Sequence, residues 1–329
     1  MQLILDTHGL VVKVRNRSFH IIGKEEKRLI GPERLTSIAV TADCLLSTAA
    51  LRLAVERHIP VYLIGPTGDV EAKLWSPHFV GLASLRQSQA LWLESGAAEG
   101  WLLRLAASKI RRQAELLQGK NAPEALLLGL RQTLSDLESP ETPAADLAAV
   151  RQTVFGLEGS VARQYWQAAA ALVPPEWAFE GRSRRPAQDP FNAALNYLYG
   201  MLYPAVESAI FAAGLDPYMG ALHVEEYDRP ALAFDCIEPF RPWVDELLMD
   251  LCHEGVLDAR HFEPRDGGWW AGKAAKAVLI PRFNDFLLGE RASDGTRTTV
   301  RNHLFAFAGA LADEIRDWYE TRKKNGPAF

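Results

Sequence analysis

The stretch WLLRLAASKIRRQAELLQG, residues 101–119, decides the fold class of most of the chain. Its apolar residues recur every three or four positions, which is typical of an amphipathic helix, and the run ends at a glycine, a common helix stop. Similar periodic stretches follow it, and proline-rich breaks separate them. Further helices are expected at residues 123–137, 144–156, 158–172, 190–213, 241–252 and 300–323.

The chain before residue 80 has the pattern of a β-rich region. Val12 and Val14 flank Lys13, and such alternation with period two is typical of half-buried strands. One helix is expected within residues 44–58, because Pro60 stops its apolar repeat. Strands are expected at residues 3–5, 10–14, 19–22, 35–40, 61–64 and 70–75.

Together these patterns predict an α+β protein with two domains. A small N-terminal β-rich domain with one helix is expected at residues 1–80, and a large all-α domain at residues 81–329. The total of 329 residues suits this division, because a domain usually holds roughly 100–200 residues.

Composition excludes several classes of protein. Hydrophobic residues make up 48% of the chain and charged residues 23%, which is typical of globular proteins. No apolar run is long enough to cross a membrane, so we expect no membrane association. The three scattered cysteines suit neither a disulfide framework nor a zinc site and indicate a reducing cytoplasm. A net charge of −5 argues against a uniformly basic nucleic-acid coat, but it allows a local basic groove.

The stretch GLDPYMGALHVEEYDRPALAFDCIEPFRPWVDELL, residues 214–248, holds the main candidates for chemistry. Asp235 and Glu238 are three residues apart and would share one face of a helix, although Pro239 can end or restart that helix. With His223, they form a donor set that suits Mg²⁺ or Mn²⁺. The alternative is an ordinary surface ion pair beside a loop histidine.

The stretch FGLEGSVARQYW, residues 155–166, adds a third carboxylate. Glu158 is expected at a helix start among small residues, which allow close approach of a ligand. It would equally suit the positive end of a helix dipole. The signatures of Rossmann folds, P-loops, serine hydrolases and zinc hydrolases are absent from the sequence.

Six blocks of the chain, taken in order, resemble one family. These are IPVYLIGPTGDVEAKLWS, LRQSQ, FGLEGSVARQYW, GRSRRPAQDPFNAALNYLYGMLY, GLDPYMGALH and RPALAFDCIEPFRP. The family is the CRISPR-associated spacer-acquisition endonuclease, the integrase subunit of the CRISPR adaptation complex, which serves antiviral defence. The resemblance covers nearly the whole chain, and the ordered set is more specific than any single block.

The resemblance implies a metal-dependent DNA endonuclease and integrase with Mg²⁺ or Mn²⁺ as cofactor. It implies Glu158, His223 and Glu238 as metal ligands, and Asp235 as the acidic residue that supports them. A 3′-hydroxyl of short foreign DNA would attack a phosphodiester of the CRISPR repeat. Candidate DNA contacts, which the arrangement of basic and aromatic residues around these blocks indicates, are Arg182, Arg184, Arg185, Arg229, Arg241 and Tyr165.

The resemblance also implies an assembly. The N-terminal domain would form a homodimer, and two dimers would flank a dimer of a small ferredoxin-like CRISPR partner protein on prespacer DNA and repeat DNA. Two alternatives stay open at this point. One is a free-standing metal nuclease or branched-DNA resolvase with the same residues, and the other is a non-catalytic DNA-binding scaffold.

Overall fold

The computed structural model describes residues 2–24, 26–35, 37–57, 59–64, 70–74, 83–138, 147–183, 186–223 and 229–325. The chain divides into two compact units, each built from three segments. The first contains Met1–Leu85, Gly200–Leu215 and Arg282–Asp313. The second contains Arg86–Tyr199, Asp216–Pro281 and Glu314–Phe329.

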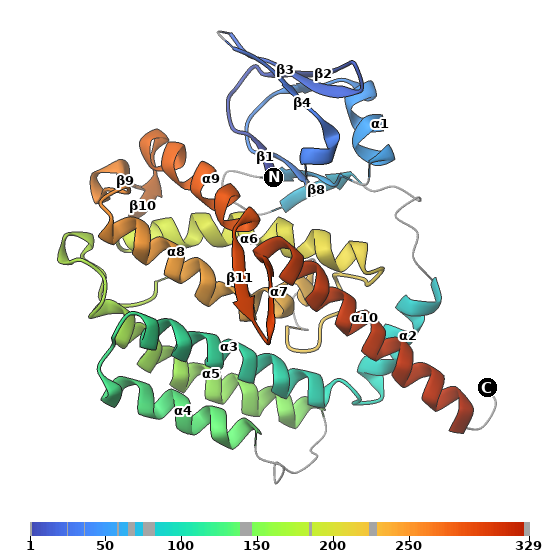
Figure 1. Cartoon of the computed structure of the whole chain (residues 1–329), viewed down its shortest axis with the longest axis vertical. Helices are drawn as coiled ribbons and strands as arrows, with labels where there is room; N and C mark the ends of the chain where they lie inside the picture. The colour runs from blue at the N-terminus through green and yellow to red at the C-terminus, as the bar shows by residue number, and fades with distance from the viewer. Residues whose placement is uncertain are drawn as a thin grey trace. The chain divides into compact units, whose positions relative to one another are not determined.

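The first unit holds two four-stranded sheets (Figure 1). In one sheet, β1, β5 and β7 run parallel and β8 is antiparallel at the edge. In the other, β4, β3 and β2 form an antiparallel meander, and the short β6 pairs in parallel with β2. The strands are β1 (Gln2–Leu5), β2 (Val11–Arg15), β3 (Ser18–Ile22), β4 (Lys27–Ile30), β5 (Ser37–Val40), β6 (Leu45–Leu46), β7 (Val61–Ile64) and β8 (Val70–Leu74).

The helix α1 (Thr48–Glu56) contacts β2 and closes the core of this region. The expected helix over 44–58 starts later than its apolar pattern indicates, because Leu45 and Leu46 pair with β2 as a strand. Ser47 then caps α1, since its side chain accepts a hydrogen bond from the amide of Ala50. The largest fully buried apolar side chains of this core include Leu5, Phe19 and Ile38.

The first unit also takes in two later parts of the chain. The hydroxyl of Tyr62 on β7 lies 2.9 Å from the hydroxyl of Ser208. Ser208 belongs to the second half of α6 (Pro190–Ala212). A hairpin of β11 (Glu290–Ser293) and β12 (Thr296–Thr299) completes the unit.

Sequence analysis missed this hairpin and a second one, β9 (Phe262–Arg265) with β10 (Gly268–Ala271). Each turns at an Asp-Gly pair in which both residues have positive φ, at Asp266-Gly267 and at Asp294-Gly295. Such pairs favour the type I′ turn of a two-residue hairpin, so the signal was present in the sequence.

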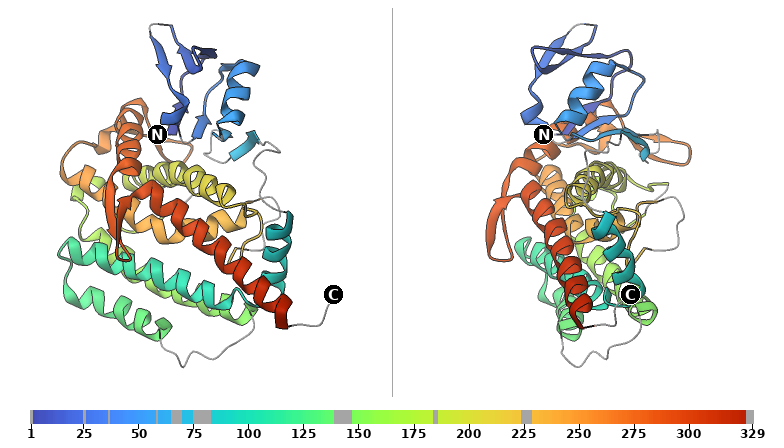
Figure 2. Two further views of the ribbon diagram at one scale, coloured as in Figure 1. Left: turned by 45° about the vertical axis from the view of Figure 1, so that its right-hand side comes forward. Right: turned by 90° about the vertical axis from the view of Figure 1, so that its right-hand side faces the viewer.

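The second unit is mostly helical. The helix α3 contacts both α4 and α5, and the three lie side by side (Figure 2). The expectation of a small β-rich N-terminal region followed by a mostly helical remainder is therefore confirmed, while the boundary at residue 80 stays a prediction. Besides α1 and α6, the helices are α2 (Ala83–Glu94), α3 (Glu99–Gly119), α4 (Glu124–Glu138), α5 (Leu147–Ala170), α7 (Ala231–Ile237), α8 (Arg241–His253), α9 (Lys273–Leu288) and α10 (Val300–Asn325).

The helix α5 is continuous where two helices were expected. A glycine inside a helix costs about 1 kcal/mol relative to alanine, and α5 contains two, Gly156 and Gly159. Its buried residues, which include Val154, Val161 and Tyr165, recur at helical spacing on both sides of these glycines. Burial of this stripe outweighs the local preference, so Glu158 lies in the middle of a helix and not at its start.

No described helix is both long enough and apolar enough to span a membrane.

The packing of α3 gives a first prediction. Leu102 on α3 is fully buried, so Leu102→Ala should lower the free energy of unfolding by about 2–5 kcal/mol through lost burial and the resulting cavity. Urea unfolding followed by circular dichroism measures this change. Leu128→Ala on α4 is the matched control, because 59% of Leu128 is exposed. Equal losses in the two variants would contradict the prediction.

Candidate metal centre and its surroundings

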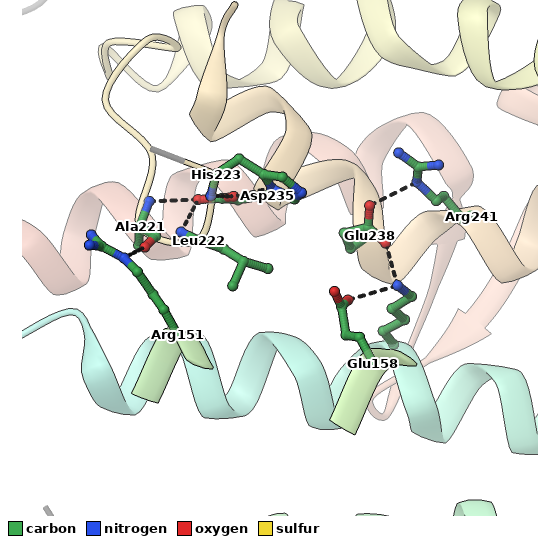
Figure 3. Close-up of polar contacts among 9 residues, drawn as sticks. Arg151, Glu158, Ala221, Leu222, His223, Asp235, Glu238 and Arg241 are labelled. Atoms are coloured by element: carbon green, nitrogen blue, oxygen red, sulfur yellow. Dashed lines mark hydrogen bonds and ion pairs between the residues drawn. The ribbon is translucent and has the colours of Figure 1, made fainter. Parts of the chain in front are cut away.

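Two carboxylates converge on one ammonium group inside the second unit. Glu158 comes from α5, Lys109 from α3, and Glu238 from the 3-10 turn Glu238–Phe240 that joins α7 to α8. The Nζ atom of Lys109 lies 2.8 Å from Oε1 of Glu158 and 2.6 Å from Oε2 of Glu238. Figure 3 shows the two glutamates facing the same point. At most one fifth of each of these three side chains is exposed.

Proline and arginine residues fix the position of Glu238. Pro239 stands at the first turn of the 3-10 helix, where its missing N–H leaves no helix bond unmade. Its carbonyl oxygen accepts a 2.9 Å hydrogen bond from Arg112 on α3. The guanidinium of Arg112 also lies 4.8 Å and 4.2 Å from the ring centres of Phe240 and Trp243. The junction of α7 and α8 is therefore held on α3.

Asp235 organises the turn that carries His223. The Asp235 side chain is fully buried. Its Oδ2 accepts hydrogen bonds from the amides of Ala221 and Leu222, at 2.6 and 3.0 Å, and its Oδ1 accepts one from the amide of His223 at 3.0 Å. Arg151 donates to the carbonyl of Ala221 from the other side (Figure 3).

The same carboxylate orients the imidazole. Nδ1 of His223 lies 2.7 Å from Oδ1 of Asp235. Because Nδ1 is engaged, Nε2 is the ring nitrogen through which His223 would bind a ligand. Asp235 and Glu238 thus have separate tasks, although their spacing predicted a shared helix face. Asp235 lies in α7 and serves the histidine turn, whereas Glu238 has left that helix and faces Lys109 and Arg241.

The charges of the site shift the pKa values of its members. Burial alone would raise the pKa of Glu238, but Arg241 and Lys109 outweigh it and hold this pKa at about 2. Burial would lower the pKa of Lys109, yet Glu238 and Glu158 raise it above its ordinary value. Burial likewise opposes the positive charge on His223, while its hydrogen bond to Asp235 and the Asp235 charge raise its pKa.

The donor set fits a hard or borderline divalent ion. Within the described ranges, no three His, Cys, Asp or Glu side chains lie close enough together to hold a metal ion as they stand. The oxygens of Glu158 and Glu238 nevertheless already converge on a shared cation, the ammonium of Lys109. Two carboxylates and an imidazole with one free nitrogen are ligands that Mg²⁺ and Mn²⁺ accept.

A second buried cluster lies beside the first and contains a residue that was expected to line the site. Tyr165 on α5 and Tyr199 on α6 donate hydrogen bonds of 2.6 and 2.5 Å to the two carboxylate oxygens of Asp245 on α8. Tyr165 is fully buried and contacts Asp245, and its expected contact with DNA stays a prediction. The guanidinium of Arg241 lies 4.7 Å from the ring centre of Tyr199 and links the two clusters.

The candidate DNA-binding arginines have different surroundings. Arg182 donates to the side-chain oxygens of Asn192 and Asn196 on α6, at 2.8 and 2.7 Å. Arg229 is exposed and comes just before α7. Arg241 forms a 3.0 Å ion pair with Glu238. Arg184 and Arg185 lie outside the described residues, and their expected contacts stay predictions.

Sequence analysis did not assign Lys109, Arg112 or Asp245 a place in the candidate site. Lys109 and Arg112 share a face of α3 with the buried Leu102 and Leu116. A positive charge within a buried apolar face needs a hydrogen-bonding or charged partner. The helical spacing of Lys109 and Arg112 therefore indicated that both residues have such partners. Asp245 similarly interrupts the apolar face of α8.

Solved structures share this fold. A CAS1 protein from Thermotoga maritima matches with a TM-score of 0.79 at 19% identity, over 96% of this chain and 97% of that one. A casposase bound to integration product matches with a TM-score of 0.78 at 22% identity, over 96% of this chain and 91% of that one. The arrangement of helices and strands described above is therefore a known fold.

Sequence comparison identifies the family. A protein named CRISPR-associated endonuclease Cas1 1, from Thermus thermophilus, is 34% identical over 294 residues, which are 88% of this chain and 87% of that protein. The family model described as CRISPR associated protein Cas1 matches residues 3–285. The chain belongs to the Cas1 family of CRISPR-associated proteins.

Asp245 leads to a prediction about stability and pH. Burial raises the pKa of this carboxyl to about 6, although hydrogen bonds from Tyr165 and Tyr199 act in the opposite direction. In the unfolded chain, the pKa of an aspartate is about 4. Between about pH 4 and 6 the folded protein therefore keeps a proton that the unfolded chain releases, so the contribution of Asp245 to the free energy of unfolding falls by about 1–3 kcal/mol as the pH rises.

Asp245→Asn should remove this fall, because asparagine does not titrate. Urea unfolding of both proteins at several values between about pH 4 and 7 gives the comparison. The stability of the wild type relative to the variant is expected to drop as the pH increases. Asp250→Asn on the same helix, where 46% of the side chain is exposed, serves as control. A difference that does not vary with pH would rule out the assigned role.

Proposed function

We propose that this protein is a metal-dependent DNA endonuclease and integrase that inserts short foreign DNA into a CRISPR array. The observation that carries the proposal is the convergence of Glu158 and Glu238 on one cationic position, in a unit where Asp235 orients His223. Membership of the Cas1 family supports it, since relatives are named as endonucleases. The casposase of the same fold is described with an integration product.

The residues of the candidate site have separate proposed roles. The carboxylates of Glu158 and Glu238, with Nε2 of His223, would hold Mg²⁺ or Mn²⁺. When bound, such an ion stabilises charge on phosphate oxygens and lowers the pKa of an attacking hydroxyl. Asp235 keeps the imidazole in place through Nδ1, and Arg241 orients Glu238 through their ion pair. Because ligation needs a neutral imidazole and Asp235 raises the His223 pKa, ion binding weakens at acidic pH.

The proposed reaction exchanges one phosphodiester for another. The 3′-oxygen of the incoming strand forms a bond to phosphorus, and the bond from that phosphorus to the 3′-oxygen of the repeat strand breaks. The attacking hydroxyl loses its proton and the leaving oxygen gains one, so the numbers of bonds and protons are conserved. With water in place of the 3′-hydroxyl, the same site would hydrolyse DNA.

The proposed assembly is a homodimer formed through the N-terminal region, which joins a small ferredoxin-like partner protein on prespacer and repeat DNA in the cytoplasm. Three leucines of that region support an interface, because their side chains are unusually exposed for apolar residues. Leu29 on β4 is 53% exposed, Leu45 on β6 is 70% exposed and Leu63 on β7 is 45% exposed.

Substitution of the ligands tests the proposal. Glu158→Gln and Glu238→Gln keep the size of the side chains but remove their charge. Each should lower strand transfer of a short duplex into a repeat-bearing plasmid by about 100-fold or more, with Mn²⁺ and the partner protein present. Glu138→Gln on α4, which loses only an exposed ion pair with Arg111, should keep full activity.

Other outcomes would favour the alternatives. Full strand transfer by Glu158→Gln would refute the metal site. Cleavage of linear DNA by this chain alone, without joining, would indicate a free-standing nuclease or a branched-DNA resolvase. DNA binding with no dependence on divalent ions in any assay would indicate a scaffold.

A second test concerns the exposed Arg229, which precedes the helix that carries Asp235. We expect it to contact phosphate, which positions DNA without reading its sequence. Arg229→Ala should weaken binding of unrelated duplexes to a similar extent and reduce the slope of log K against log salt by about 1. Fluorescence anisotropy at several salt concentrations measures both quantities. Arg260→Ala, which also removes an exposed arginine, is the control, and an unchanged slope in Arg229→Ala would contradict the contact.

A further inference from the structure

Lys109 is a charged residue on a face of α3 that is otherwise largely apolar. Leu105 and Leu102, one and two turns earlier, are buried. Only 17% of the Lys109 side chain is exposed, and its ammonium contacts Glu158 and Glu238 at 2.8 and 2.6 Å. A lysine in such surroundings has lost most of its hydration, so its stability there depends on these two partners.

The two carboxylates depend equally on the lysine. Because both reach one nitrogen atom, they lie close to each other in a space that is largely closed to water. Two carboxylates in this situation cannot both stay ionised unless a cation lies between them. Lys109 supplies that cation, because its ammonium group contacts both carboxylates.

We infer that Lys109 is an internal counter-ion of the metal-free enzyme, which holds the position between Glu158 and Glu238 until a divalent ion displaces it. The inference rests on the proposed function, since it takes these two glutamates to be metal ligands. An ammonium and a divalent cation repel each other strongly at contact distance in partly buried surroundings. Occupation by Lys109 and occupation by the ion are therefore mutually exclusive.

Two properties follow from this exclusion. Lys109 stabilises the protein in the absence of metal, because it neutralises the carboxylates. It also lowers the apparent affinity for metal, because each ion that binds must break two short ion pairs. Lys109 is thus a positioning residue that acts through the ligands, and its effect should be measurable without DNA or catalysis.

Metal binding to the free, full-length protein provides the test. Isothermal titration calorimetry with Mn²⁺, and electron paramagnetic resonance of unbound Mn²⁺, give the affinity. Lys109→Met should bind Mn²⁺ about tenfold or more tightly than the wild type, because it removes the competing charge from a close ion pair. Lys109→Arg keeps the charge and should stay within about threefold of the wild type.

Thermal unfolding gives an independent measurement. In EDTA, Lys109→Met should unfold at a lower temperature than the wild type, and saturating Mn²⁺ should raise its Tm by more than it raises that of the wild type. Lys120→Met is the matched control, since Lys120 follows α3 about three turns beyond Lys109 and pairs with Asp250. Its Mn²⁺ affinity should equal that of the wild type. If Lys109→Met does not fold, Lys109→Gln takes its place with the same expectations.

The outcomes separate this inference from the proposed function. If Lys109→Met binds Mn²⁺ no more tightly than the wild type, while Glu158→Gln abolishes binding, the role of Lys109 is refuted and the metal site stands. If neither the wild type nor Lys109→Met binds Mn²⁺, the metal site and the inference both fail. Tighter binding in Lys109→Met, with wild-type affinity in Lys109→Arg and Lys120→Met, supports the inference.

Discussion

Two carboxylates that share a small, largely buried space repel each other, and the helical unit is arranged around their neutralisation. Positive charges come from α3 and from Arg241 at the start of α8, which pairs with Glu238. Lys109 bridges Glu158 of α5 and Glu238 at the junction of α7 and α8. Arg112, one turn further along α3, binds the backbone of that junction through the carbonyl of Pro239. The amphipathic helix α3 is therefore also the element that sets the distance between the candidate metal ligands.

A single buried carboxylate controls the remaining ligand. Asp235 accepts hydrogen bonds from three consecutive amides and contacts the imidazole of His223, so the turn and the ring orientation depend on the same two oxygen atoms. The turn also lies tight against α7, because a Cβ atom at Gly220 would come within 2.7 Å of the backbone of Ala231. Any larger side chain at Gly220 would push the turn away from the helix and weaken the hydrogen bonds that hold His223. The position of His223 thus depends on residues that are not themselves candidate metal ligands.

Periodicity in the sequence predicted most helices and strands, because each repeat reports local burial on one face. One of its errors arose where tertiary contacts outweigh local preference. The glycines of FGLEGS suggested a break at residue 157, but burial of Val154 and Val161 keeps α5 continuous. Family resemblance indicated Glu158, His223, Asp235 and Glu238, whereas nothing in the sequence predicted that Lys109 contacts the two glutamates. Its partners are 49 and 129 residues away, and a helical pattern shows that a charged residue faces inward without showing which residue it meets.

The first unit is discontinuous in sequence, and this has a consequence for how the protein is made. The β-rich region shares its compact unit with Gly200–Leu215 and Arg282–Asp313. The hydrogen bond between the hydroxyls of Tyr62 and Ser208 can form only after more than 140 further residues have been added. During synthesis on the ribosome, the unit that contains the N-terminal strands therefore stays incomplete until its last segment, residues 282–313, has been made.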